Sequence, residues 1–124
     1  MNITSADAPR PISAVLAPSA KPAIRRAAVA DRESEAVGYL VAHRHLTFLA
    51  NGLVVWVEEV MVDAAARGQG VGRQLMTAAE SWAEDSGAAY VSLASRRSGA
   101  FYDALGYEDS ATFYKRPVTG RAAR

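Results

Sequence analysis

The feature of this sequence that most limits its possible folds is a glycine-rich turn between an apolar segment and an amphipathic one. Residues 53–62 are dense in β-branched and aromatic side chains, which is typical of a strand. The turn that follows contains Gly68, Gly70 and Gly72. Beyond the turn, an apolar stripe at helical spacing consists of Val71, Leu75, Ala78, Ala79 and Trp82. The segment therefore predicts a strand, a turn and a helix over 71–86.

The start of this predicted helix is suited to binding an anion. The first N–H groups of a helix have no partner within it, and the helix dipole places partial positive charge there. Glycines let the backbone approach a ligand closely, and successive amides in such a turn form a concave nest for phosphate oxygens. The backbone of 67–72 is therefore a candidate phosphate-binding turn, and a purely structural turn is the alternative.

Three phosphate-binding motifs can be compared with this turn. A P-loop ends in Gly-Lys-Ser/Thr, whereas this turn continues as Gly72-Arg73-Gln74. The dinucleotide fingerprint G-x-G-x-x-G would need glycine in place of Arg73. The acetyl-CoA motif, Arg/Gln-x-x-Gly-x-Gly/Ala, is matched at every defined position by Arg67, Gly70 and Gly72. The spacing therefore favours acetyl-CoA over the ligands of the other two motifs.

Upstream of this unit, the sequence predicts an antiparallel meander. Residues 23–30 are a weak strand candidate, 36–48 a stronger one, and 53–62 form the third strand. The charged stretch 31–35 is interpreted as the turn between the first two strands. The dipeptide Asn51-Gly52 lies between two apolar runs, and its residue types suit the positive φ angles of a tight hairpin turn.

Downstream of the helix, a short apolar strand is predicted at 88–94, after a helix stop at Gly87. A helix between two strands is a βαβ crossover, so this strand should run parallel to the third strand of the meander. A second short helix is predicted at 98–105, closed by Gly106, and a last strand at 111–118. The predicted fold class is therefore α/β, a mixed sheet in which an antiparallel meander precedes a βαβ unit.

The two ends of the chain are predicted to lie outside the domain. Residues 1–22 contain four of the five prolines, and proline suits neither a helix interior nor a central strand. This stretch is therefore interpreted as an extended N-terminal arm. The basic stretch 119–124 is interpreted as a tail, which leaves 23–118 as the domain.

Composition excludes several classes of protein. The chain has no cysteine, so disulfides, thiolate zinc sites and cysteine nucleophiles are excluded. A formal net charge of +1 is too weak to indicate nucleic acid or an anionic membrane as a partner. The longest plainly apolar run, 53–57, is far too short to span a bilayer, and the N-terminus lacks the pattern of a signal peptide. A cytoplasmic location is therefore expected.

These motifs resemble the GNAT superfamily of acyl-CoA-dependent N-acyltransferases over roughly 23–118, and the resemblance rests on three runs of residues. They are Glu58-Glu59-Val60-Met61-Val62, Arg67-Gly68-Gln69-Gly70-Val71-Gly72 and Phe101-Tyr102-Asp103-Ala104-Leu105-Gly106-Tyr107. The last run is similar to the family's FY-x-x-x-G-F/Y signature. The resemblance implies a GNAT fold. The strand and two helices with which the family usually begins are not expected, because 1–22 is too short and too rich in proline for them.

The resemblance also implies a ligand and an activity. The ligand is acetyl-CoA or another acyl-CoA, and the activity is acyl transfer to a primary amine of a small molecule or a protein. By resemblance, strand residues 60–62 hydrogen-bond the pantetheine amides where this strand splays from 88–94. The expected cofactor-binding residues are Val60, Met61, Val62, Arg67, Gly68, Gln69, Gly70, Val71, Gly72, Arg73 and Tyr102. No metal is expected, since His43 and His45 share a strand face without an evident third ligand.

Acyl transfer to an amine requires that the ammonium form, with a pKa of about 10.4 for a lysine-like amine, lose a proton before attack. A carboxylate can take that proton, often through water. Glu58 and Glu59 are adjacent carboxylates in an apolar strand, and they point to opposite faces unless a bulge intervenes. The resemblance favours Glu58 as the base, and a solvated edge charge is the alternative for one of the pair.

The leaving thiolate must be stabilised or protonated, and Tyr102 is the candidate acid. The resemblance implies this role, because the family tyrosine at this position lies near the thioester sulfur. Packing of the short helix by Phe101 and Tyr102 is the alternative. No cysteine and no Ser/His/Asp constellation is evident, so the amine is expected to attack directly within a ternary complex.

Two expectations concern the protein as a whole. A non-catalytic CoA-binding or regulatory module of the same fold is the alternative function, since the acceptor side is expected to be reduced. A homodimer is expected, because a missing acceptor wall would leave apolar sheet surface uncovered, and such patches usually mark interfaces.

Overall fold

The computed structural model describes residues 13–14 and 24–118. The expected arm 1–22, apart from its residues 13–14, and the expected tail 119–124 lie outside the described residues. The chain divides into two compact units, Met1–Leu93 and Ala94–Arg124. The first unit contains a sheet and the long helix α1, and the second contains the short helix α2.

The first unit is a five-stranded mixed sheet in the order β1-β2-β3-β4-β5. The strands are β1 (Ser13–Ala14), β2 (Arg25–Arg32), β3 (Glu35–Thr47), β4 (Gly52–Val62) and β5 (Val91–Ser92). Strands β1 to β4 pair antiparallel, and β5 pairs parallel to β4. This arrangement confirms the predicted antiparallel meander followed by a βαβ unit. Strand β1 was not predicted, because the proline-rich stretch 1–22 was expected to form an arm outside the domain, whereas its residues 13–14 pair with β2.

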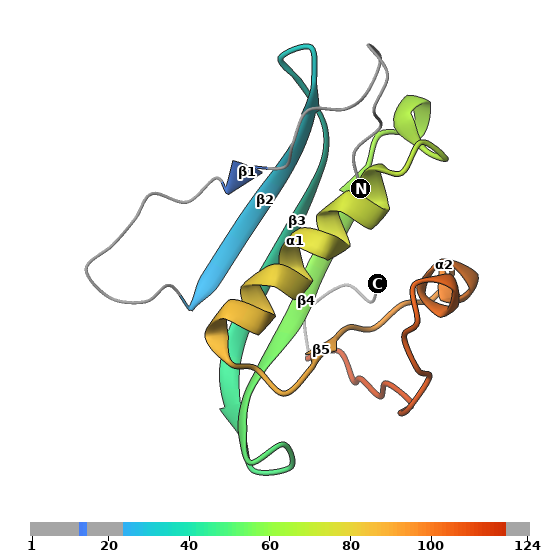
Figure 1. Ribbon diagram of the computed structural model, residues 1–124. Coiled ribbons are helices and arrows are strands. Elements are labelled where there is room, and N and C mark those ends of the chain that lie inside the picture. The colour runs from blue at the N-terminus through green and yellow to red at the C-terminus, as the bar shows by residue number, and fades with distance from the viewer. Residues whose placement is uncertain (1–12, 15–23, 119–124) are drawn as a thin grey trace. The chain divides into compact units, whose positions relative to one another are not determined.

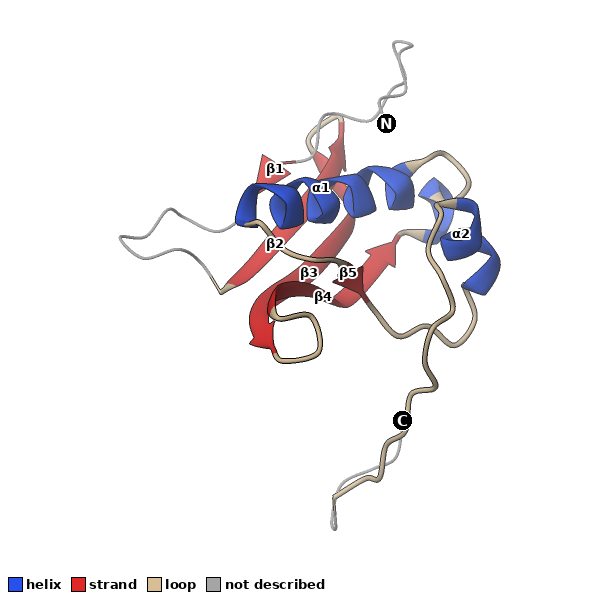
Figure 2. Cartoon of the chain, turned by 60° about the horizontal axis from the view of Figure 1, so that its bottom comes forward, coloured by secondary structure: helices blue, strands red, loops and turns tan. Residues whose placement is uncertain are grey.

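Helix α1 (Val71–Ser86) has the predicted boundaries and lies along one face of the sheet, as Figures 1 and 2 show. It ends at Gly87, whose φ of 71° is left-handed, and the Ala88 N–H then donates to the Ala83 carbonyl at 2.9 Å. The buried helix residues are Val71, Gln74, Leu75, Met76, Ala79, Trp82 and Ala83. This face is wider than the predicted stripe because α1 contacts β2, β3, β4 and β5, and Ala78 lies at its margin, partly buried.

The predicted core position of Trp82 is confirmed, and two arginines flank its ring. The guanidinium carbons of Arg26 and Arg44 lie 5.5 Å and 5.2 Å from the ring centroid. Arg44 Nη1 also donates to Ser86 Oγ at 2.6 Å. These contacts from β2 and β3 hold the C-terminal end of α1 on the sheet.

The turn predicted at 31–35 between the first two strands is confirmed, whereas the tight turn predicted at Asn51-Gly52 is wrong. Glu33 and Ser34 form the two-residue turn between β2 and β3, with φ of 52° and 70°. Asn51 has a positive φ of 54°, but Gly52 pairs with Thr47 and is the first residue of β4. The pairing of β3 with β4 therefore leaves a longer loop, 48–51, between the two strands, and Gly52 belongs to β4.

The predicted strands after α1 are shorter or missing. The 88–94 prediction corresponds to β5, which has only two residues. In the second unit, α2 (Gly99–Ala104) is present and Gly106 has a φ of 92°, but the predicted strand at 111–118 is wrong. Strand formation needs a ladder partner, and no strand of the second unit is found among its described residues.

Gly38 on β3 lets the start of α1 approach the sheet closely. A Cβ at this position would lie 2.8 Å from the Met61 carbonyl oxygen, 3.1 Å from Val71 Cγ1 and 3.3 Å from Leu75 Cδ1. The backbone oxygen cannot move without disturbing the ladder between β3 and β4. We therefore expect Gly38→Ala to lower the free energy of unfolding by about 1–3 kcal/mol, measured by urea denaturation.

Gly52→Ala is the matched control for this prediction. No atom of the described residues lies within 4 Å of a Cβ built on Gly52, so the added methyl group has no such atom to clash with. This variant should unfold at the same urea concentration as the wild type or a slightly higher one. Equal midpoints for the Gly38→Ala and Gly52→Ala proteins would contradict the packing argument.

None of the helices in the described ranges has the length and apolar character needed to cross a membrane.

Candidate functional site

The glycine-rich turn joins β4 to α1 through one turn of 3₁₀ helix, η1 (Ala64–Ala66). Gly68 and Gly70 have positive φ values of 76° and 85°, which glycine adopts without steric cost. Gly70 immediately precedes α1, and no side chain caps that end of the helix. The two glycines therefore turn the chain so that α1 begins at Val71 with its first amides open.

The amide groups of this turn are available to a ligand. Among the described residues, none of the backbone N–H groups of 68–73 donates to another backbone group. The bonds on either side are made: Ala66 N–H donates to the Asp63 carbonyl at 2.9 Å, and Gln74 N–H donates to the Gly70 carbonyl at 3.1 Å. A run of free donors at the positive end of a helix dipole is suited to phosphate oxygens.

Two side chains of the turn hold its shape. Arg67 Nε donates to the Val62 carbonyl at 3.1 Å, and Gln69 Nε2 donates to the Ala65 carbonyl at 3.2 Å. Both residues were expected to bind the cofactor, and in the structure each also ties the turn to its own backbone. Arg73 is exposed in the first turn of α1, at the same helix end as the free amides.

The free edge of β4 is a second available backbone surface. Strand β5 pairs with β4 only through Val55↔Val91 and Trp56↔Ser92. Within the described ranges, no strand pairs with residues 57–62 on that edge. This stretch includes the three strand residues that the resemblance assigns to the pantetheine arm, and it leads directly into the glycine-rich turn.

The two adjacent glutamates lie at a one-residue bulge in β4. Val41 pairs with Glu59 and Ala42 pairs with Val57, so Glu58 has no residue opposite it on β3. A bulge of this kind shifts the alternation of side chains along the strand. The two carboxylates are therefore not required to point to opposite faces.

The contacts of the two carboxylates place both on the sheet face turned away from α1. Glu58 Oε2 lies 3.5 Å from His43 Nδ1, and the Tyr39 hydroxyl donates to Glu59 Oε1 at 2.8 Å. Tyr39 and His43 alternate along β3 with the buried residues that pack toward α1. The hydrogen bond to Glu59, together with the charge of that carboxylate, raises the pKa of the Tyr39 phenol.

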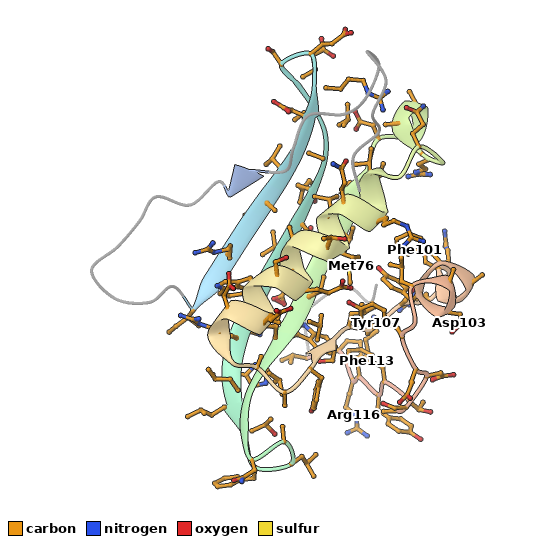
Figure 3. All side chains as sticks on the ribbon, viewed as in Figure 1. Met76, Phe101, Asp103, Tyr107, Phe113 and Arg116 are labelled. Carbon is orange, nitrogen blue, oxygen red and sulfur yellow. The ribbon has the colours of Figure 1, made fainter. Side chains whose placement is uncertain are left out.

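The second unit carries the candidate acid on α2. The Tyr102 ring is half-buried between Phe101 and Tyr107, with centroid distances of 4.9 Å and 5.9 Å and edge-to-face geometry in both pairs. Phe101 and Tyr107 are labelled in Figure 3. Burial raises the pKa of the Tyr102 phenol above its usual value of 10.0, so the group keeps its proton through the neutral range. Tyr102 therefore takes part in the aromatic packing that was named as the alternative to catalysis, and its phenol also keeps the proton that an acid needs.

Sequence reasoning missed the partners of the two glutamates. Tyr39 lies opposite Met61 and His43 lies opposite Trp56, and the bulge between these pairs brings the glutamates next to them. Strand alternation alone could have placed Tyr39 and His43 on one face, but no local signal marked the bulge. The rings of His43 and His45 lie 5.6 Å apart. Among the described residues, no group of three or more potential metal-binding side chains occurs.

A strand, a glycine-rich turn and a helix, preceded by an antiparallel meander, define an α/β protein whose turn presents backbone donors suited to an anionic ligand. The chain matches the sequence profile of the acetyltransferase (GNAT) family over residues 6–107. It therefore belongs to this family, as the resemblance in sequence had suggested.

Solved structures share the fold. A putative acetyl transferase from Pyrococcus furiosus has 26% sequence identity and a TM-score of 0.69, and the match covers 76% of this chain and 66% of that one. A transcriptional regulator from Bacillus halodurans C-125 has 30% identity and a TM-score of 0.69, with 79% and 69% of the two chains covered. Glucosamine-6-phosphate N-acetyltransferase from Arabidopsis thaliana has 19% identity and a TM-score of 0.71, with 76% and 67% covered, and shows the likeness of fold alone.

The chain spans about two thirds of the length of these solved structures. The comparison with curated proteins found no significant match.

Proposed function

We propose that this chain transfers an acetyl or other short acyl group from acyl-CoA to a primary amine of a small molecule or a protein. The observation that carries the proposal is the run of free amide donors at 68–73, at the start of α1 and next to the free edge of β4. Phosphate oxygens of CoA fit these donors, and the amides of its pantetheine arm fit the β4 edge. Membership of the GNAT family supports the same ligand.

The proposal assigns different residues to different parts of the acyl-CoA molecule. The pyrophosphate is bound by the backbone of the turn, and the pantetheine arm is bound by the strand that precedes it. The residues proposed to bind acyl-CoA are Val60, Met61, Val62, Arg67, Gly68, Gln69, Gly70, Val71, Gly72, Arg73 and Tyr102. The Arg73 guanidinium adds a positive charge beside the turn, which favours a doubly charged pyrophosphate.

The reaction that we propose is a direct attack. Glu58 takes a proton from the ammonium group of the acceptor, and the neutral nitrogen then attacks the carbonyl carbon of the thioester. The C–S bond breaks, and the departing thiolate takes a proton from Tyr102. The nitrogen loses a second proton, which restores Tyr102, and Glu58 releases the first to solvent. The products are an amide, a free thiol and one proton.

Tyr102→Phe tests the proposed acid, because it keeps the ring and removes only the hydroxyl. We expect kcat to fall by about 10², near the lower end of the range for a lost acid or base, because a thiolate is a stable leaving group. The dissociation constant for CoA, measured by calorimetry, should change little. Phe101→Leu, which alters the packing around α2 and leaves the hydroxyl, is the control. Full activity in Tyr102→Phe would remove Tyr102 from the mechanism.

The experiment that tests the function itself is an assay with acetyl-CoA and a panel of primary amines, with free thiol and acetylated amine both measured. We expect thiol and amide to form in equal amounts with at least one amine. Acetyl-CoA should also raise the melting temperature, because it binds the folded state. Neither binding nor turnover with any short-chain acyl-CoA would overturn the proposal.

A regulatory CoA-binding module is the second candidate function. The observation that favours it is the similarity to the transcriptional regulator from Bacillus halodurans, which has 30% identity to this chain. On this alternative, acyl-CoA binds with the predicted thermal shift and no amine in the panel is acetylated. The same assay therefore separates the two functions.

We also propose that the protein is a cytoplasmic homodimer. Large apolar side chains are highly exposed at the tip of the β3–β4 hairpin, where Leu46, Phe48 and Leu49 are 76%, 101% and 96% exposed. Such patches usually mark an interface. Light scattering that shows a monomer at every working concentration would reject the dimer, and cell fractionation tests the location.

A further inference from the structure

The two glutamates of β4 have different contacts with side chains of β3. Glu59 accepts a short hydrogen bond of 2.8 Å from the Tyr39 hydroxyl, so one of its oxygens already has a donor. Glu58 has no such donor among the described residues, and its Oε2 atom lies 3.5 Å from His43 Nδ1. The two glutamates therefore share a face of the sheet but are not equivalent.

The Nδ1 atom of His43 is in an unusual position for a polar atom. It is shielded from solvent and has no hydrogen-bond partner in the described part of the chain, although 28% of the His43 side chain is exposed. A buried polar atom without a partner costs about 1–3 kcal/mol, so it gains most from any partner within reach. Glu58 Oε2 is only about half an ångström beyond the usual distance of such a bond.

Among the described neighbours of His43, Glu58 provides the acceptor that lies within reach of Nδ1, at 3.5 Å. Arg25 is the register partner of His43 on β2, and an arginine cannot accept a hydrogen bond. His45, on the same strand, stacks at 5.6 Å with its ring tilted by 37°, which is not a hydrogen-bonding arrangement. On β4 the register partner is Trp56, whose indole is a donor only. Unlike these three side chains, the carboxylate of Glu58 can accept from Nδ1 at the distance that the structure shows.

We propose that His43 is a positioning residue for Glu58: its Nδ1–H donates to the Glu58 carboxylate and so orients that carboxylate toward the ammonium group of the acceptor. This inference rests on the proposed function, since it assigns Glu58 the first proton transfer. The bulge is what lets both glutamates lie on this face, because adjacent residues of a regular strand point to opposite faces. The imidazole touches neither substrate and acts only through the glutamate.

Substitutions at position 43 separate this role from a structural one. Asparagine places an amide N–H near the position of Nδ1, glutamine places it near that of Nε2, and leucine has no donor. We expect His43→Asn to keep most of the wild-type kcat, and His43→Gln and His43→Leu to lose about tenfold. The KM for acyl-CoA should be unchanged in all three. His45→Asn and His45→Leu are the matched controls, and neither should lower kcat.

A double-mutant cycle tests whether His43 acts through Glu58. In the Glu58→Gln background, His43→Leu should cause no further loss of kcat. A tenfold loss that persists in that background would overturn the inference, as would equal losses in His43→Asn and His43→Leu or a change confined to the KM for acyl-CoA.

A readout independent of turnover keeps this inference distinct from the proposed function. In ¹⁵N NMR spectra of the full chain at neutral pH, we expect His43 to be protonated at Nδ1 in the wild type, and that population to fall in Glu58→Gln. Protonation only at Nε2 in the wild type would overturn the inference even in an active enzyme. A wild type that acetylates no amine but shows the Nδ1 proton would overturn the proposed function and support the Glu58–His43 contact.

Discussion

Gly70→Val is expected to abolish the binding of CoA and acyl-CoA by this protein. Gly70 has φ of 85° and ψ of 7°, a left-handed conformation that a β-branched residue strongly disfavours. The valine should therefore pull the turn out of shape and swing the free amides of 68–73 away from a common centre. Its side chain would also obstruct the approach of the phosphates to the backbone. We expect the dissociation constant measured by calorimetry to rise at least about 100-fold, which corresponds to about 2.7 kcal/mol.

Gly87→Val is a closely matched control for this variant. Gly87 also has a left-handed conformation, with φ of 71° and ψ of 25°, but it lies at the other end of α1. A Cβ there meets no atom of the described residues within 4 Å, so the main cost of this substitution is backbone strain. Both variants should lose stability to a similar degree, and only Gly70→Val should lose CoA. If CoA binds Gly70→Val as tightly as the wild type, the turn is not the pyrophosphate site.

The parts of the fold that local signals determine could be predicted from the sequence. Helix α1 has the predicted boundaries because an apolar stripe begins after one glycine and ends at another, Gly87. The parallel direction of β5 follows from the helix that connects it to β4, because a helical crossover returns the chain to the same end of the sheet. These features depend on residues that are neighbours in sequence or one helical turn apart.

The parts that pairing between strands determines could not be predicted in this way. The register of β3 on β4 decides that Gly52 belongs to β4 and that the loop between these two strands is 48–51, not a tight turn at Asn51-Gly52. The residues 111–118 have a strand-like composition but no ladder partner in their own unit, so composition alone misled the prediction. A segment with strand propensity forms a strand only where it can pair with the edge of a neighbouring strand.

The same distinction between local signals and strand pairing applies to the candidate site. The glycine-rich turn is contiguous in sequence, so the sequence alone is enough to identify its residues. The bulge at Glu58 depends on the pairing of two strands, and it places Tyr39 and His43 beside carboxylates that lie 20 and 15 residues away in sequence. The sequence could therefore name the two glutamates but could not state their partners or tell their environments apart.

Glu58→Gln is expected to lower kcat by about 10² to 10⁴, the usual contribution of one general base, while the dissociation constant for acyl-CoA stays the same. Glutamine keeps the size and polarity of the side chain but cannot take up a proton from the ammonium group. The reaction then depends on the small fraction of acceptor that is already neutral, which rises tenfold per pH unit until the amine's own pKa, about 10.4 for a lysine-like amine. The rising limb of the pH–rate profile should therefore move toward that value.

The same reasoning predicts which acceptors rescue the variant. An acceptor whose amine has a lower pKa is more often neutral at pH 7, so the ratio of wild-type to Glu58→Gln activity should shrink as the amine pKa falls across a series of acceptors. Glu59→Gln is the matched control, because it changes the adjacent carboxylate on the same face, which already accepts the bond from Tyr39. It should lower kcat less and show no dependence on amine pKa. Equal losses in the two variants, or a loss in Glu58→Gln that does not change with amine pKa, would mean that Glu58 is not the base and that the site promotes transfer by holding the two substrates together.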